Sequence, residues 1–125
     1  MRSLYRGMNA DGDYPEVAAS AKGLGVRTTG EDADVVPNGD GLVHPGAGMS
    51  VSPDDPRFLP TFRRPREHGG TAKHPVWVLA ESQLPEDLVF LPDTPEHGVI
   101  GPARAMPVEA YEAALAGTQR MWRRV

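Results

Sequence analysis

Proline and glycine limit the length of every helix and strand that this chain can form. Its 125 residues include 13 prolines and 14 glycines, both above average use. Proline lacks the backbone donor that helix interiors and central strands need. The prolines are spread through apolar segments and are not confined to a polar low-complexity tract. We therefore expect one compact domain over residues 1–125, built from short elements and long ordered loops, with residues 30–41 as the place for any local disorder.

Four apolar segments are typical of short strands: residues 3–8, 75–80, 88–91 and 97–100. The segment 75–80 is the strongest, and we expect it at the centre of a sheet. The last three segments recur about every ten residues, a spacing that favours an antiparallel meander over crossover units. Residues 57–66 have no clear period and are expected to form a loop that packs Phe58 and Phe62 onto the core.

Two further segments are typical of helices. Residues 16–22 can form two helical turns, ended by Gly23 and Gly25. A longer helix begins at Pro107, which suits the first helical position. Its apolar stripe indicates docking on a sheet and consists of Val108, Tyr111, Leu115, Thr118 and Trp122. Antiparallel strands followed by a docked C-terminal helix predict an α+β fold.

Composition argues against several classes of function. The net charge of −4 is unusual for a general nucleic-acid binder, and the basic residues within 57–66 and 120–124 are interpreted as solvated faces. The chain has no cysteine and its four histidines lack close spacing, so we expect neither a disulfide nor a metal site. We expect no signal peptide and no membrane-spanning segment, because the residues show neither a leader pattern nor a membrane-length apolar run. We expect a cytoplasmic protein without a membrane partner that, if exported, leaves without a cleaved leader.

A glycine-rich turn near the middle of the chain leads into a short extended segment. Gly48 permits close approach of a ligand to the backbone. In an extended strand, Ser50 and Ser52 point the same way. This pattern fits a wall that presents hydroxyls to a ligand, and it equally fits an ordinary junction between loop and strand. A hydrolase that pairs either serine with His44 or His97 is a weaker interpretation, because no nucleophile elbow is present.

Arg6 is the unusual residue of the first strand. By the two-residue period of a strand it shares one face with Leu4 and Met8, while Tyr5 lies on the other. One interpretation is an edge-strand arginine whose charged end reaches solvent. The other is a guanidinium held inside a cleft, where its planar fork would bind phosphate or carboxylate. The residues alone leave both open.

The order of these features resembles a known family. Leu4-Tyr5-Arg6 comes first, Gly48-Met49-Ser50-Val51-Ser52 follows, and then come the apolar segment 75–79 and a late strand before the final helix. This order resembles small bacterial ADP-ribosyltransferase-like toxins, and in particular the type VI secretion effector cytotoxins of Pseudomonas. The resemblance covers nearly the whole chain. It implies split, curved antiparallel β-sheets with nicotinamide adenine dinucleotide (NAD) as the substrate in the cleft between them, and no metal.

The resemblance also implies roles for individual residues. Arg6 matches a first-strand arginine that grips the phosphates of the dinucleotide. Ser50 and Ser52 match a Ser-x-Ser strand that shapes the nicotinamide pocket, and His97 is expected to make a polar contact in the cleft. The expected NAD-binding set is Tyr5, Arg6, Gly48, Met49, Ser50 and Ser52, and the expected catalytic set is Arg6, Ser52 and His97.

The catalytic glutamate of such transferases belongs on a late strand, and here the sequence departs from the pattern. His97 and Gly101 share the relevant face, and neither supplies a carboxylate. Glu96 is adjacent but faces the other way on a regular strand. Glu67, Glu81 or His97 would have to take its place, or the protein binds a nucleotide without turnover.

The expected function is therefore an NAD-binding, ADP-ribosyltransferase-like toxin that acts inside a target cell in interbacterial competition. The family resemblance implies a cognate immunity protein and a target macromolecule that the residues do not name. The alternative is a non-enzymatic effector or interaction module on the same fold, because the glutamate is absent. A transferase that acts on RNA phosphates is a third interpretation, against which the acidic net charge speaks.

Overall fold

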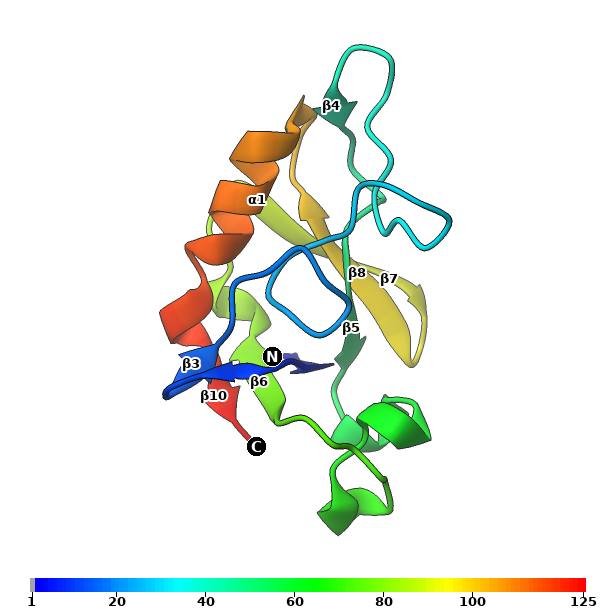
Figure 1. Cartoon of the computed structure of the whole chain (residues 1–125), viewed down its shortest axis with the longest axis vertical. Coiled ribbons are helices and arrows are strands. Elements are labelled where there is room, and N and C mark those ends of the chain that lie inside the picture. Colours follow the sequence, from blue (N-terminus) through cyan, green and yellow to red (C-terminus); the bar gives the residue numbers. More distant parts are fainter. Residues whose placement is uncertain (1) are drawn as a thin grey trace.

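The computed structural model describes residues 2–125 and has an α+β fold, with antiparallel strands and an α-helix near the C-terminal end (Figure 1). The predicted fold class is confirmed. Six strands form the main sheet in the order β10 (Arg123–Arg124), β6 (Val76–Ala80), β1 (Ser3–Gly7), β5 (Met49–Pro53), β8 (His97–Pro102) and β7 (Leu88–Thr94). The helix α1 spans Val108–Ala116.

The remaining elements are short, as the many prolines and glycines require. Two small ladders join β2 (Ala10–Asp11) to β3 (Tyr14–Pro15) and β4 (Leu42–Val43) to β9 (Met106–Pro107). Single turns of 3-10 helix are η1 (Pro56–Phe58), η2 (Thr61–Arg63), η3 (Arg66–His68), η4 (Glu81–Gln83) and η5 (Gln119–Met121). Loops connect these pieces.

The strand β5 divides the main sheet because it pairs with different neighbours at its two ends. Its C-terminal end pairs with β1, where Ser52 lies opposite Tyr5. Its N-terminal end pairs with β8, where Met49 lies opposite Ile100. The ladders on the two sides of β5 therefore do not run alongside each other, and the sheet is split at this strand.

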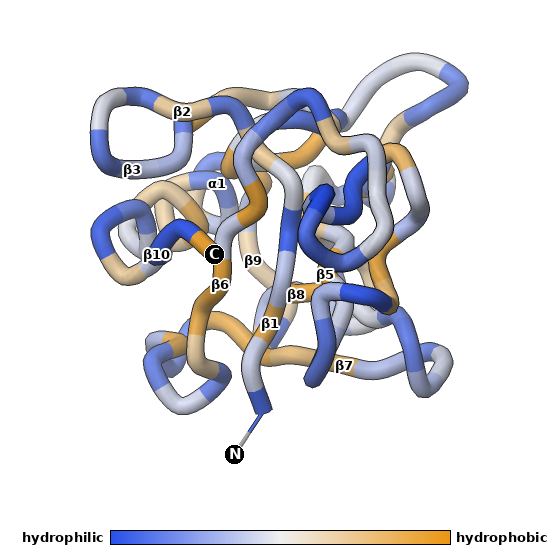
Figure 2. Tube along the Cα trace, turned by 90° about the horizontal axis from the view of Figure 1, so that it is seen from below, coloured by the Kyte–Doolittle hydropathy of each residue, from blue (hydrophilic) through white to orange (hydrophobic). Residues whose placement is uncertain are grey.

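The core lies where the two parts of the sheet meet α1. Figure 2 shows hydrophobic segments along β6 and hydrophilic loops at the outside. Trp77 and Trp122 are among the largest fully buried side chains. Their indole N–H groups donate to the Met8 carbonyl and the Thr118 hydroxyl, so burial leaves neither donor unpaired.

Tyr111 connects the helix to the point where the sheet divides. Its buried hydroxyl accepts a hydrogen bond from the Met49 backbone N–H at 3.0 Å and donates to the Ile100 carbonyl. Met49 and Ile100 lie opposite each other in the β5–β8 ladder, so the phenol sits between two strands at a point where they would otherwise pair directly. Burial raises the pKa of Tyr111, which stays protonated at neutral pH.

Two expectations about secondary structure are wrong. Residues 16–22 form no helix; an isolated bridge between Val17 and Leu24 closes them into a tight curl. Gly23 and Gly25 approach Ala18 too closely for a side chain, so tertiary packing overrides the helical preference of the segment. The strands β6, β7 and β8 do not form the expected meander either, because β1 and β5 separate β6 from the β7–β8 hairpin.

The C-terminal helix is shorter than its apolar stripe. Tyr111, Leu115, Thr118 and Trp122 are all buried as the period predicts, but α1 ends at Ala116 and the chain continues through η5. The segment 57–66 also differs from expectation. It forms short 3-10 turns that bury Leu59, while 63% of Phe62 is exposed. None of the helices among residues 2–125 is long and apolar enough to cross a membrane.

We predict that Tyr111→Phe destabilises the protein. The substitution preserves the ring but removes the hydroxyl that links Met49 and Ile100. Loss of a buried hydrogen-bonding group costs about 1–3 kcal/mol when its partners stay unpaired. Urea unfolding measures the change in the free energy of unfolding. Tyr14→Phe is the matched control, since the side chain is half-buried; a Tyr111→Phe variant as stable as this control would contradict the assignment.

Candidate functional site

A pocket of about 270 Å³ opens where β1 and β5 separate. Arg6, Ser50, Ser52 and His97, four of the residues singled out in the sequence, all line it. The two serines lie two positions apart on β5, and the period of a strand directs them to the same side. The structure thus brings together residues from β1, β5 and β8 that are up to 91 positions apart in the chain.

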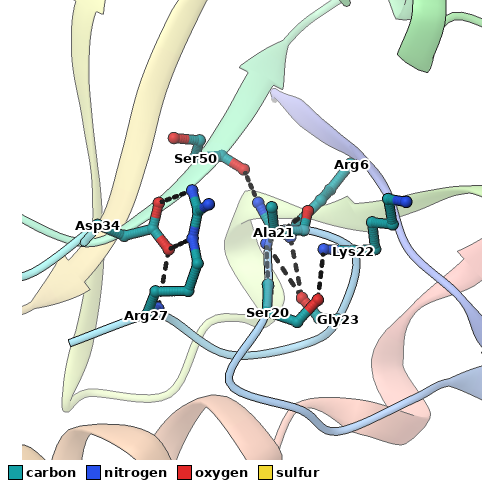
Figure 3. A network of polar contacts seen from close by, with 8 residues as sticks. All are labelled: Arg6, Ser20, Ala21, Lys22, Gly23, Arg27, Asp34 and Ser50. Carbon is teal, nitrogen blue, oxygen red and sulfur yellow. Dashed lines mark hydrogen bonds and ion pairs between the residues drawn. The ribbon is translucent and has the colours of Figure 1, made fainter. Parts of the chain in front are cut away.

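Arg6 is buried at the floor of this pocket, with 7% of its surface exposed. Its Nη1 donates to the Ser50 carbonyl at 2.8 Å, while Nε and Nη2 donate to the Gly23 carbonyl at 3.2 and 3.0 Å. Longer contacts reach the carbonyls of Ser20 and Ala21 (Figure 3). Within residues 2–125 no carboxylate forms an ion pair with Arg6, so its hydrogen bonds go to backbone carbonyls alone.

The Ser50 contact explains how the strands are held apart. The β1–β5 ladder ends at Ser52, opposite Tyr5. In a continued ladder Gly7 would lie opposite Ser50, but Ser50 pairs with β8 instead. The Arg6 guanidinium donates a hydrogen bond to the Ser50 carbonyl, which has no partner in the β1–β5 ladder. A side chain therefore bridges the gap between the strands and satisfies the backbone there.

Burial has the largest effect on the pKa of Arg6. It lowers the pKa of the guanidinium to about 10, and the nearby cations Arg63 and Arg27 act in the same direction. The negative charge of Asp34 acts in the opposite direction. At neutral pH Arg6 remains protonated, so the pocket floor carries a fixed positive charge.

Arg27 and Asp34 form a second charged pair beside Arg6, visible in Figure 3. The Arg27 Nε and Nη2 donate to the two carboxylate oxygens of Asp34 at 3.2 and 3.1 Å, and the Arg27 backbone N–H donates to Oδ2 at 2.8 Å. Burial raises the pKa of the Asp34 carboxyl, but the Arg27 hydrogen bonds and charge outweigh it, and the net shift is downward. Asp34 is ionised at neutral pH.

The outer wall of the pocket comes from η2. Phe62 and Arg63 both line it, and the Arg63 guanidinium lies over the Phe62 ring at 5.3 Å from its centre. Neither side chain is buried. The mouth therefore offers an aromatic surface next to a cation.

Three residues expected to bind NAD do not line this pocket. Tyr5 is half-buried beside Ser52 in the sheet. Met49 begins β5 and Gly48 precedes it, with no room for a side chain at Gly48 against the Ile100 carbonyl. These glycine and methionine positions shape the junction of β5 with β8. Their role in NAD binding stays a prediction.

The carboxylates considered from the sequence also lie elsewhere. Glu81 pairs with Arg2 at 2.8 Å, and Glu67 and Glu96 are exposed outside the pocket. On β8 a side chain at Gly101 would meet the Ala47 carbonyl, which explains why that position carries no glutamate. Of the residues described, Asp34 is the one that contributes a carboxylate to the pocket lining.

Arg27, Asp34, Phe62 and Arg63 were missed as site residues because none belongs to a strand motif. A usable signal did exist in the loop. Val26 and Val35 are apolar residues that flank a polar, turn-rich segment, and the structure buries both in the core. Two buried anchors predict a loop pinned at both ends rather than a disordered one.

His97 lies at the edge of the pocket, at the start of β8. Its Nδ1 is 2.8 and 2.9 Å from the two carboxylate oxygens of Asp93, an exposed residue on β7. This contact lowers the pKa of the Asp93 carboxyl. The remaining ring nitrogen is left for a ligand or for solvent.

The comparison with known families decides where the chain belongs. The family model of the Tse2 ADP-ribosyltransferase toxin matches residues 2–124. The chain belongs to that family. Comparisons with curated proteins and with solved structures gave no match. Membership of the Tse2 family supports an ADP-ribosylating toxin, and because ADP-ribosyl transfer takes its ADP-ribose from NAD, it implies NAD as the substrate.

We predict that Arg6→Lys lowers the free energy of unfolding by at least about 2 kcal/mol, since lysine keeps the charge but cannot reach the Ser50 and Gly23 carbonyls together. Urea unfolding at pH 7 measures this loss. Arg104→Lys is the control, because its exposed pair with Asp87 contributes little to stability. Equal stability of the two variants would show that Arg6 does not join β1 to β5.

Proposed function

We propose that this chain binds NAD in the pocket between β1 and β5 and transfers its ADP-ribose to a macromolecule of a target cell. The observation that carries the proposal is the charge of that pocket. Three guanidinium groups and one carboxylate line it in a protein whose net charge is −4. A local excess of positive charge next to two serine hydroxyls suits a ligand with a diphosphate and ribose hydroxyls.

Arg27 and Arg63 are better placed than Arg6 to meet the phosphates. Arg6 uses four of its five N–H groups on backbone carbonyls, which leaves one on Nη1. Arg27 contacts Asp34 through Nε and Nη2, so its Nη1 is available. The Arg63 guanidinium lies over the Phe62 ring and makes no side-chain hydrogen bond within residues 2–125. The proposal thus assigns phosphate binding mainly to these two side chains and the fixed floor charge to Arg6.

The exposed ring of Phe62 supplies a stacking surface for a heterocycle of the dinucleotide. An aromatic side chain stacks on a flat base at a gain of roughly 1–3 kcal/mol. Its position at the mouth of the pocket, next to Arg63, would place the base over the outer wall while the diphosphate reaches inward. Ser50 and Ser52 would then face the nicotinamide ribose.

The setting of this activity follows from the resemblance to type VI secretion effectors. We propose delivery into a competing bacterium, and a cognate immunity protein that protects the producing cell. The neighbouring gene gives a direct check of the immunity protein. Co-expression of its product with the toxin should restore growth of a susceptible bacterium, and no rescue by any adjacent product would contradict this part of the proposal.

A non-enzymatic effector remains the second candidate because β8 carries no carboxylate in the described chain. Expression in a susceptible bacterium separates the two. Under the transferase proposal, the Arg27→Gln, Arg63→Gln double substitution abolishes toxicity through loss of NAD binding. Unchanged toxicity of a stably folded double variant would favour a binding module.

We predict that Arg27→Gln and Arg63→Gln each weaken NAD binding about tenfold or more, since a charge-assisted hydrogen bond contributes about 1.5–3 kcal/mol. Isothermal titration calorimetry with NAD measures the dissociation constants. Arg104→Gln removes the same charge at an exposed residue outside the pocket and should leave affinity unchanged. Absence of binding by the wild-type protein at millimolar NAD would overturn the proposed function.

A further inference from the structure

We propose that Asp34 supplies the carboxylate of the transferase site, in place of a glutamate on the late strand. This inference rests on the proposed function of the same pocket. It assigns the role to an aspartate in the loop between β3 and β4, which no strand pattern indicates.

Position distinguishes Asp34 from every other candidate. It lines the pocket together with Arg6, Ser50 and Ser52, and Figure 3 shows it paired with Arg27. Glu67, Glu81 and Glu96 do not line that pocket. A carboxylate that acts on a bound NAD has to reach the ligand, and Asp34 is the acidic side chain that the described structure places there.

The loop holds this carboxylate in one place. The backbone N–H groups of Asp34 and Val35 both donate to the Arg27 carbonyl, at 2.8 and 3.2 Å, and the side chain receives three hydrogen bonds from Arg27 in return. Val26 and Val35, next to the pair on either side, are buried in the core. Only 17% of the Asp34 side chain is exposed. Such a group needs little reorganisation when positive charge develops near it.

The charges that face Asp34 come from several elements. Arg27 lies on its own loop and makes the direct contact, and Arg6 on β1 acts across the pocket. Arg63 on η2 and His97 on β8 line the same pocket. Arg27 and Arg6 favour the ionised form of Asp34 over the neutral acid, and the ionised form is the one that can stabilise a cation.

Arg27 also connects Asp34 to the proposed phosphate site. Its Nε and Nη2 hold the carboxylate, while Nη1 makes no hydrogen bond within residues 2–125. One planar guanidinium can therefore hold Asp34 on one side and a phosphate oxygen on the other. This arrangement would fix the distance from the diphosphate to the carboxylate, and with it the place of the nicotinamide ribose.

The chemical step is a substitution at the ribose C1′. The bond between C1′ and the nicotinamide nitrogen breaks, and both electrons leave with nicotinamide, which becomes neutral. The positive charge passes to the ribose as an oxocarbenium ion, and the Asp34 carboxylate stabilises it electrostatically. An acceptor hydroxyl, or water, then bonds to C1′ through its oxygen, and its proton passes through the Asp34 carboxylate to solvent. The products are nicotinamide, the ADP-ribosylated acceptor and one proton.

Asp34→Asn tests the assignment. Purified wild-type and variant proteins are incubated with NAD and a bacterial lysate as the source of acceptor, and released nicotinamide is quantified by chromatography. We expect NAD affinity close to that of the wild type and nicotinamide release about 10²–10³-fold slower, the size of effect seen when one group that stabilises transition-state charge is removed. Asp32→Asn, which removes an exposed charge from the same loop, should release nicotinamide at the wild-type rate.

A pH profile separates this role from simple support of the loop. Arg27→Gln removes the hydrogen bonds and the charge that hold the pKa of Asp34 down, while burial, which raises it, remains. Since release needs the ionised carboxylate, activity should be lost at higher pH in Arg27→Gln than in the wild type. A purely structural Asp34 predicts reduced rates in both variants with no movement of the acidic limb. Asp34→Glu, which retains a carboxylate, should recover part of the activity.

The outcomes separate the proposed function of the pocket from the role of Asp34 in it. A wild-type protein that releases no nicotinamide overturns the proposed function, and the role of Asp34 falls with it. Wild-type release together with an Asp34→Asn variant of equal rate leaves the transferase standing and overturns only the assignment of Asp34. If thermal unfolding shows that Asp34→Asn is not folded, the Arg27→Gln profile decides: an unmoved acidic limb overturns the assignment.

Discussion

A buried arginine between two strands is the contact on which the rest of this molecule depends. Arg6 takes the Ser50 carbonyl where β5 leaves β1, and on the other side it takes the Gly23 carbonyl of the curl that Val17 and Leu24 close. Burying a charge is unfavourable unless its donors are satisfied, and here carbonyl dipoles satisfy four of five. The guanidinium therefore bridges the gap between the strands and satisfies backbone carbonyls on both sides of it.

The same contact sets the electrostatics of the site. Backbone carbonyls accept the hydrogen bonds of Arg6, but no carboxylate of the described residues pairs with it. Its positive charge therefore acts electrostatically on the nearby Asp34 and Arg27. The Arg27 hydrogen bonds and charge, with a smaller contribution from Arg6, keep the Asp34 carboxylate ionised in spite of its burial. The remaining guanidinium donors favour a ligand with negative charge. Fold and site are linked at Arg6: a substitution there changes strand separation and pocket charge together, which is why phosphate contacts are better tested at Arg27 and Arg63.

Much of the fold could be predicted from the sequence because the strand period is local. Leu4, Arg6 and Met8 share a buried face, and Ser50 and Ser52 share a pocket, as the alternation of side chains requires. Strand order could not be predicted in this way, since β6 pairs with β1 from the other end of the chain and not with its successor. The helix predicted for residues 16–22 was wrong for a related reason. Arg6 and close glycine contacts with Ala18 shape this backbone, and helix propensity takes no account of such tertiary contacts.

The site shows the same division between local pattern and tertiary contact. A glutamate on β8 was expected at the position of Gly101, yet the backbone of Ala47 lies where its Cβ would be, so this fold variant excludes any side chain there. A transferase built on such a strand needs its carboxylate from another element. Loops can supply one when buried anchors fix them, and Val26 and Val35 provide those anchors on both sides of the Arg27–Asp34 pair. In the proposed transferase, the loop rather than β8 therefore supplies the carboxylate of the site.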